Sequence, residues 1–167
     1  MKNSIEFYGL QQEYLKIASK GFKDRSVWIV RTLGDYTYIC NSHAIARVDK
    51  ANCLIKDTGW QGNPEFLVRS LKFKGDEVLL RTTGIKRIHH DHTLVEFEST
   101  DGNNFKVYLN KEFIEMFGFS VKWCEVLFYG SSPKAPVFLS LGIPEQEEHI
   151  RAMILPVFIN EKQEETE

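Results

Sequence analysis

The sequence predicts an α+β fold in which a mostly antiparallel sheet carries two amphipathic helices on one face. Segments that alternate apolar and polar residues recur along the chain between turn residues, as in antiparallel strands. Apolar residues three to four positions apart occur near the start and again after residue 110, as in helices that cover a sheet. The 167 residues suit one domain with a buried core, which we place at residues 1–160.

The composition is that of a folded protein without a membrane segment. Hydrophobic residues make up 43% of the chain and aromatic residues 13%, which argues against disorder. No apolar run approaches the roughly 20 residues that span a bilayer, and the first residues do not resemble a secretory signal. Three cysteines without close metal-type spacing, Cys40, Cys53 and Cys124, indicate reduced, buried thiols. We therefore expect a cytoplasmic protein with no cofactor.

The first half of the predicted fold covers residues 5–60. Residues 6–20 have helical spacing, with apolar residues on one stripe and polar residues, Gln11 and Gln12 among them, on the other. Gly34 and Asp35 then read as a tight turn between two strands. The strands expected in this half are residues 26–33, 36–40 and 44–48.

The middle of the chain is expected to be rich in strands. The expected segments are 65–73, 76–84, 93–100 and 104–109. A helical turn is the alternative for the first of them. In the third, Val95 and Phe97 alternate with Glu96 and Glu98, as in a strand with one exposed face.

The second half covers residues 105–160 and repeats the order of helix and strands. Asn110 is a suitable N-cap for a helix over 111–118, and Gly118 is a suitable stop. The strands expected after this helix are 123–130, 135–142 and 149–159. Residues 161–167 are acidic and are expected to form a disordered tail. Neither half buries its apolar face alone, so the two are expected to pair.

Three histidines, His89, His90 and His92, surround Asp91 and are the most conspicuous candidate for a chemical site. On a strand, His90 and His92 face the same side, but a catalytic metal site needs a third protein ligand. We interpret the segment as the polar end of a hairpin. A protein that binds a metal or a small molecule through the three histidines is the alternative, and acid–base chemistry is a third. Because no known catalytic motif occurs elsewhere, we expect a protein that is not an enzyme.

Residues 107–159 resemble the closing half of the bacterial DNA polymerase sliding clamp, the β subunit of the replicative holoenzyme. The family's order of elements is matched by Asn110 with "KEFIEMF", then "CEVLFYG", "APVFLS" and "MILPVFI". Residues 10–48 resemble a clamp domain more weakly, and in them His43 and Ala46 match residues of the family's pattern. The resemblance implies a single-domain, divergent relative with a DNA-clamp-like fold.

A clamp domain places its helices along a hole for DNA, so the resemblance implies contacts of basic side chains with double-stranded DNA. The candidates are Lys16, Lys20, Lys23, Arg25 and Lys111. A solvated helix face without a ligand is the alternative, and Glu13 and Glu115 dilute the positive charge. A closed ring implies a homo-oligomer of about six copies; a ringless relative from a phage or mobile element is the other possibility.

The family also docks short peptides of replication proteins in a groove beside the last strand. The matching residues here are Met153, Leu155, Pro156, Val157 and Phe158. Core positions of a final strand are the alternative interpretation. The resemblance thus implies a DNA-associated replication accessory or processivity-type protein without catalytic activity. Two other functions stay open: the histidine-centred binding protein, and a binding or inhibitory partner of a host clamp or polymerase.

Overall fold

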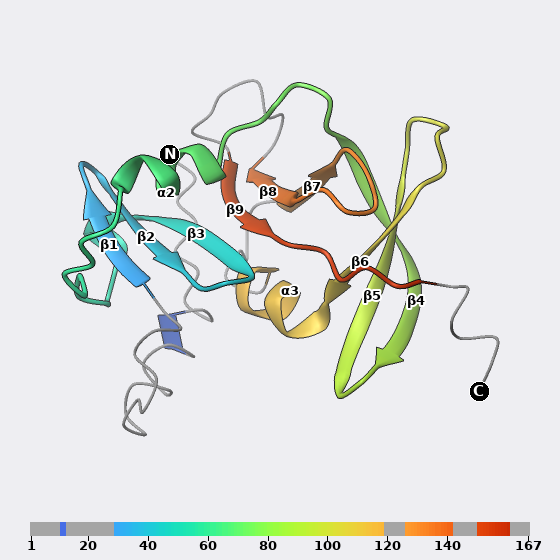
Figure 1. The fold of residues 1–167 in the computed structure, drawn as a ribbon, viewed down its shortest axis with the longest axis horizontal. Coiled ribbons are helices and arrows are strands. Elements are labelled where there is room, and N and C mark those ends of the chain that lie inside the picture. Colours follow the sequence, from blue (N-terminus) through green and yellow to red (C-terminus); the bar gives the residue numbers. More distant parts are fainter. Residues whose placement is uncertain (1–10, 13–28, 119–125, 142–149, 161–167) are drawn as a thin grey trace.

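The computed structural model describes residues 11–12, 29–118, 126–141 and 150–160, and in these residues nine strands form a single sheet (Figure 1). The strands are β1 (Ile29–Leu33), β2 (Tyr36–Cys40), β3 (Ala44–Asp49), β4 (Val78–His89), β5 (His92–Ser99), β6 (Lys106–Asn110), β7 (Val126–Gly130), β8 (Val137–Leu141) and β9 (Ile150–Ile154). The helices are the 3-10 turn η2 (Lys50–Asn52), α2 (Pro64–Ser70) and α3 (Lys111–Gly118).

The sheet consists of three antiparallel groups of three strands each. The strand order is β1-β2-β3-β9-β8-β7-β4-β5-β6, and every neighbouring pair is antiparallel. The group β7–β9 lies in the middle and joins the other two, because β9 pairs with β3 and β7 pairs with β4. Residues far apart in sequence meet at both joints, with Ala46 opposite Ala152 and Leu80 opposite Phe128.

Helices α2 and α3 lie on opposite faces of this sheet. Side chains alternate between the faces along a strand, and in β2 Ile39 belongs to one core cluster whereas Tyr38 and Cys40 belong to the other. Helix α3 packs on the Ile39 side through Phe113 and Ile114. Helix α2 packs on the other side, where its fully buried Leu67 and the buried C-cap residue Leu71 belong to one cluster with Tyr38, Ile45 and Phe138.

The predicted fold of two helix-plus-strands halves with both helices on one face is therefore wrong. The nine strands of the described residues form one continuous sheet, with short helices on both of its faces. The physical reason lies in residues 51–104, which supply α2 and two further strands, β4 and β5. These strands lie between β7 and β6 and so separate two strands of the second half, and residues 5–60 and 105–160 do not pair as two equivalent modules.

Most of the expected strands are confirmed, and one is wrong. Residues 65–73 were expected to form a strand but lie mainly in α2. Asn63 accepts a hydrogen bond of 3.0 Å from the backbone N–H of Glu65, and Pro64 occupies the first turn, so the local helix signals prevail. Of the expected helix over 6–20, only Gln11 and Gln12 lie in the described residues and both are helical.

Gln11 differs from its expected place on a polar face. Its side chain is fully buried, and its amide oxygen accepts a hydrogen bond of 2.6 Å from the backbone N–H of Leu54. The expected acidic tail, residues 161–167, lies outside the described residues. None of the helices in the described residues is both long and apolar enough to cross a bilayer.

Candidate functional site

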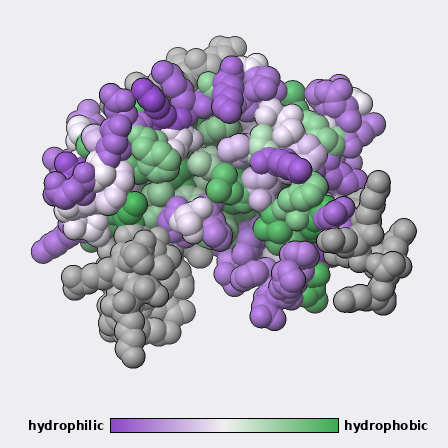
Figure 2. All heavy atoms as spheres, viewed as in Figure 1, coloured by the Kyte–Doolittle hydropathy of each residue, from purple (hydrophilic) through white to green (hydrophobic). Residues whose placement is uncertain are grey.

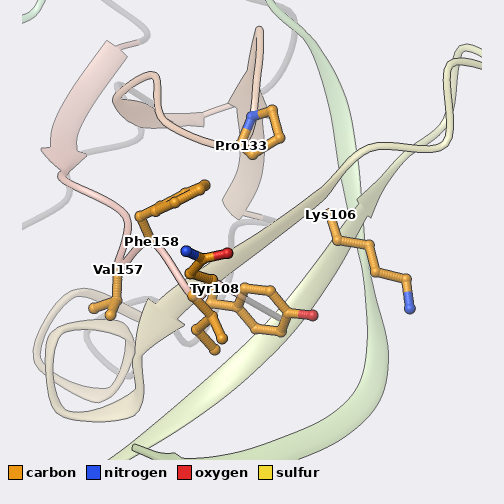
Figure 3. Close-up of a pocket in the computed structure, with 7 residues that line it drawn as sticks. Lys106, Tyr108, Pro133, Val157 and Phe158 are labelled. Atoms are coloured by element: carbon orange, nitrogen blue, oxygen red, sulfur yellow. The ribbon is translucent and has the colours of Figure 1, made fainter. Parts of the chain in front are cut away.

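A hollow of about 450 Å³ opens where the segment after β9 passes β6 and the β7–β8 turn. It is lined by Lys106, Tyr108, Pro133, Val157, Phe158, Ile159 and Asn160. Figure 3 shows Phe158 and Pro133 on one side of this hollow, and Tyr108 and Lys106 on β6 at the other. We call it the C-terminal groove. Figure 2 shows hydrophobic side chains gathered in this region of the surface, bordered by hydrophilic ones.

The groove exists because residues 155–160 leave the middle of the sheet and cross to its end. The backbone N–H of Leu155 donates to the carbonyl of His43 over 2.8 Å. The N–H of Val157 then donates to the carbonyl of Tyr108 over 2.8 Å, which attaches the segment to the edge strand β6. Ile159 is buried against Leu94 and Tyr108, so the segment is held by a small apolar core of its own.

An exposed aromatic residue, Phe158, lines the groove, and a cation, Lys134, lies beside it. Phe158 is 53% exposed, although its neighbour Ile159 is buried. The ammonium of Lys134 lies 4.1 Å from the centre of this ring, within the range of a cation–π contact. Lys134 and Pro133 are exposed in the β7–β8 turn, where the N–H of Ala135 donates to the hydroxyl of Ser132 over 3.1 Å. The wall therefore combines an apolar surface with positive charge.

Beneath the groove lies a buried carboxylate, that of Glu96 on β5. The Tyr108 hydroxyl donates to its Oε2 over 3.1 Å. The ammonium of Lys106 is 3.1 Å from Oε1, and the guanidinium of Arg87 is 4.0 Å from Oε2. Burial, the largest influence, raises the pKa of Glu96, but Lys106, Thr83 and Tyr108 together lower the pKa below its ordinary value. The charged Glu96 therefore holds two residues of the groove, Lys106 and Tyr108, in place.

Sequence alternation alone predicts the wrong environment for Glu96. Glu98 is exposed, as expected, but Glu96 is only 1% exposed. Tyr108 lies directly opposite Glu96 on β6. The segment that packs on Tyr108 comes from residues 157–159, about 60 positions after Glu96 in the chain. The alternation of residues along β5 does not show that a segment so distant in sequence covers Glu96. The one sequence feature that could have indicated burial of Glu96 is the aromatic Tyr108 in the neighbouring edge strand.

Only two of the five residues that were predicted to line a peptide groove lie in the C-terminal groove. Val157 and Phe158 do line the C-terminal groove. Met153 lies on β9 and packs in the cluster beneath α2. Leu155 is 43% exposed and Pro156 is half-buried, and neither belongs to the groove lining. Sequence reasoning missed Lys106, Tyr108 and Pro133, which other parts of the chain contribute, and also Ile159 and Asn160 of the same segment.

Of the five residues predicted to contact DNA, Lys16, Lys20, Lys23 and Arg25 lie outside the described residues. The fifth, Lys111, stands at the start of α3, and its ammonium is 3.1 Å from Oε1 of Glu115. This pairing over one helical turn offsets much of the charge that Lys111 would offer to a phosphate.

The three histidines lie at the end of the β4–β5 hairpin, as their interpretation as a polar hairpin end predicts. His89 and His92 are opposite each other as the last pair, and His90 and Asp91 form the turn, with φ of 51° at His90. The rings of His89 and His90 meet edge to face at 4.3 Å. Because His90 lies in the turn, it does not share a strand face with His92. The residues described contain no group of three or more His, Cys, Asp or Glu side chains placed to hold a metal ion.

The polar groups of the groove lining are the ammonium of Lys106, the phenol of Tyr108 and the amide of Asn160. Its described residues include no histidine, cysteine, serine or carboxylate that would act as a nucleophile or proton acceptor, and Lys106 is engaged with Glu96. Comparison with protein-family models, with curated proteins and with solved structures finds no match to this chain.

Proposed function

We propose that this chain is a non-enzymatic binding protein that holds a short peptide of a partner protein in the C-terminal groove. The peptide we propose carries an apolar or aromatic anchor followed or preceded by an acidic residue. The observation that carries the proposal is Phe158, which stays 53% exposed in a segment that is otherwise fixed by hydrogen bonds and by a buried neighbour.

The size of the groove supports a peptide side chain as the ligand. A hollow of about 450 Å³ lies within the range of about 300–1,000 Å³ that is usual for ligand sites. Its main apolar surfaces, Phe158, Val157 and Pro133, come from two separate segments of the chain. An aromatic or leucine side chain placed between them replaces water on each surface.

The charge of the groove supports an acidic neighbour for that anchor. Lys134 is exposed, and its ammonium lies over the Phe158 ring, beside the position proposed for the anchor. Lys106 adds a second positive charge, although Glu96 offsets it. A carboxylate on the peptide therefore meets net positive charge, which favours an acidic peptide over a basic one.

The resemblance of residues 107–159 to sliding clamps supports a protein of DNA replication as the source of the peptide. The proposal does not depend on a ring or on helices that face DNA. It needs only the crossing of residues 155–160 over β6, which holds Phe158 beside Lys134.

The test is a selection from a random peptide-display library on the immobilised protein. We expect enriched peptides to contain an aromatic or aliphatic residue within three positions of Asp or Glu. Calorimetric titration of an enriched peptide should show at least about tenfold weaker binding for Phe158→Ala, as for an anchor-contacting residue. Lys134→Glu should weaken binding by a similar factor and reduce its dependence on salt.

Two matched variants control for general effects of these changes. Phe66 on α2 is 55% exposed, so Phe66→Ala removes a similarly exposed ring far from the groove. Lys74→Glu reverses an exposed charge in the loop before β4. Both variants should bind the peptide like the unaltered protein. Enrichment of basic peptides, or equal losses for Phe158→Ala and Phe66→Ala, would overturn the proposal.

A further inference from the structure

A strongly acidic segment follows directly on the C-terminal groove. Asn160, the last described residue, lines the groove itself. The next seven residues, 161–167, read EKQEETE, in which four glutamates against one lysine give a net charge of -3. This acidic tail lies outside the described residues, but the point where it begins is fixed, because Ile159 is buried.

The described surface around the groove has the opposite charge. The ammonium of Lys134 lies over the Phe158 ring, and the guanidinium of Arg87 lies 5.3 Å from the centre of the Tyr108 ring. Lys106 lines the groove, and its side chain is 45% exposed. We call Lys106, Lys134 and Arg87 the cationic rim of the groove.

The acids beside the cationic rim do not cancel its charge. On the face of the sheet that carries the groove, Glu98 lies opposite both Arg81 on β4 and Lys106 on β6, and Glu96 is buried beneath the rim. With the β7–β8 turn included, the described residues supply four cations, Arg81, Arg87, Lys106 and Lys134, against two acids, Glu96 and Glu98. The balance stays positive when Asp101 is counted, which lies in the β5–β6 turn and accepts hydrogen bonds from Asn103.

The cationic rim is within reach of the acidic tail. Extended residues span at most about 3.3–3.6 Å each, so a segment of seven residues reaches roughly 23–25 Å beyond Asn160. The ring of Phe158, only two positions before Asn160, already lies 4.1 Å from the Lys134 ammonium. The glutamates can therefore approach Lys134 while residues 155–160 keep their described positions.

We propose that the acidic tail binds the cationic rim of its own chain and competes there with the acidic residue of a partner peptide. The tail contains no apolar residue, so it covers the charged part of the site and leaves the Phe158 surface to the apolar anchor of the peptide. As regulation of peptide binding, this inference rests on the proposed function. The contact between tail and rim is tested separately from any peptide.

Attachment to the same chain favours the tail over a free acidic ligand. A tethered segment of this length has an effective concentration in the millimolar range. Each exposed ion pair is weak on its own and is screened by salt. The tail should therefore occupy the rim only part of the time, and a peptide with an apolar anchor should still displace it. The expected effect on peptide affinity is about twofold to fivefold.

The first experiment compares NMR spectra of the isotope-labelled 167-residue chain with and without the charges of its tail. The tail variant combines Glu161→Gln, Glu164→Gln, Glu165→Gln and Glu167→Gln, which keeps the length of the tail. The reporters are the backbone amides of Lys134 and Ala135, since both are remote in sequence from the substitutions. At about 0.1 M salt, both amides should differ in chemical shift between the two proteins. At about 1 M salt, where the Debye length falls to about 3 Å, the difference should shrink at least about threefold.

Matched variants separate the tail's charge from general effects. Gln163→Asn with Thr166→Ser changes the tail without changing its charge and should leave both amides unshifted. The tail-dependent difference at Ala135 should disappear in Lys134→Gln and persist in Lys74→Gln, which removes an exposed lysine outside the groove. The inference is overturned if the tail variant leaves both amides unshifted, if the uncharged change of the tail shifts them equally, or if the difference grows with protein concentration, as for the tail of a second copy.

The second experiment measures competition by calorimetric titration of an enriched acidic peptide. It should bind the tail variant about twofold to fivefold more tightly than the unaltered protein at about 0.1 M salt. The same peptide with its acid replaced by the amide should bind both proteins equally. Equal affinities of the acidic peptide would overturn the competition. If peptides bind but the amides do not shift, this inference alone fails; if no peptide is selected, the proposed function fails and the amide shifts alone decide whether the tail binds the rim.

Discussion

The hydroxyl of Tyr108 donates a hydrogen bond of 3.1 Å to the carboxylate of Glu96, a side chain that is only 1% exposed. The same tyrosine accepts the backbone hydrogen bond of Val157 and lines the C-terminal groove. One residue thus connects a buried charge, the edge of the sheet and the candidate binding site. The stability of this region should depend on the ionisation of Glu96.

Glu96→Gln should lower the free energy of unfolding by about 1–3 kcal/mol at pH 7, because it removes the charge of a buried, hydrogen-bonded group. The pKa of Glu96 is lowered in the folded protein, so its stabilising effect is present above the pKa of an unfolded glutamate, about 4.3. That effect is lost as the pH falls through the lower, folded value. The difference between Glu96→Gln and the unaltered protein should therefore shrink below about pH 4.

Urea unfolding followed by circular dichroism at pH 7 and at about pH 3.5 measures this difference. Glu98→Gln is the matched control, since Glu98 lies on the same strand but is exposed. It should change the free energy of unfolding by no more than about 0.5 kcal/mol. A loss for Glu96→Gln that is independent of pH would contradict the predicted role of its charge.

Leu67→Ala should destabilise the protein by about 2–5 kcal/mol, because Leu67 is fully buried between α2 and the sheet. The next residue, Val68, is 47% exposed on the same helix, so Val68→Ala should cost no more than about 0.5 kcal/mol. Chemical denaturation of the two variants is the measurement. Similar losses for both would mean that α2 does not pack on this face as described.

Asn110→Ala should cost about 1 kcal/mol of unfolding free energy, because the Asn110 side chain accepts a hydrogen bond of 3.0 Å from the backbone N–H of Glu112 at the start of α3. Asn110→Ser should recover most of this loss, since serine caps helices about as well as asparagine. Thermal unfolding of the three proteins at one concentration gives the comparison. If serine were no better than alanine, capping would not be the reason for the loss.

Cys40 should resist alkylation while the protein is folded. Burial raises the pKa of its thiol to about 11, whereas an ordinary cysteine has a pKa of about 8.5. Because only the thiolate reacts, iodoacetamide at pH 8 should modify Cys40 at least about a hundredfold more slowly in the folded protein than in urea. Mass spectrometry of the digested protein measures both rates at the same residue. Equal rates in the two conditions would show that Cys40 is accessible.

Local chemistry predicts the elements of this protein better than their assembly. The alternation in residues 36–40 and 93–100 is enough to identify β2 and β5, and Asn110 correctly marks the start of α3. Residues 65–73 contain apolar side chains that suit a strand as well as a helix. There the deciding signal is the preceding Asn63-Pro64 pair, which caps and begins α2.

The order of strands and the candidate site depend on contacts that local patterns do not encode. The insertion of β9 between β3 and β8 joins residues about 100 positions apart, as in the pair Ala46 and Ala152. The groove has the same origin, because β6, the β7–β8 turn and the last described segment each contribute part of its lining. Val157 and Phe158 were predicted from a family resemblance. Lys106 and Tyr108 can be identified as groove residues only from the assembled sheet.

The position of β9 also determines when the sheet can be completed as the chain folds during synthesis. A ribosome completes the other eight described strands before β9, yet β9 alone joins the first three strands to the remaining five. Until its residues emerge, β3 and β8 each present an unpaired apolar edge, a hazard for pairing with other chains. Nascent chains halted before residue 150 should therefore recruit chaperones, and release of the last strand should end that dependence.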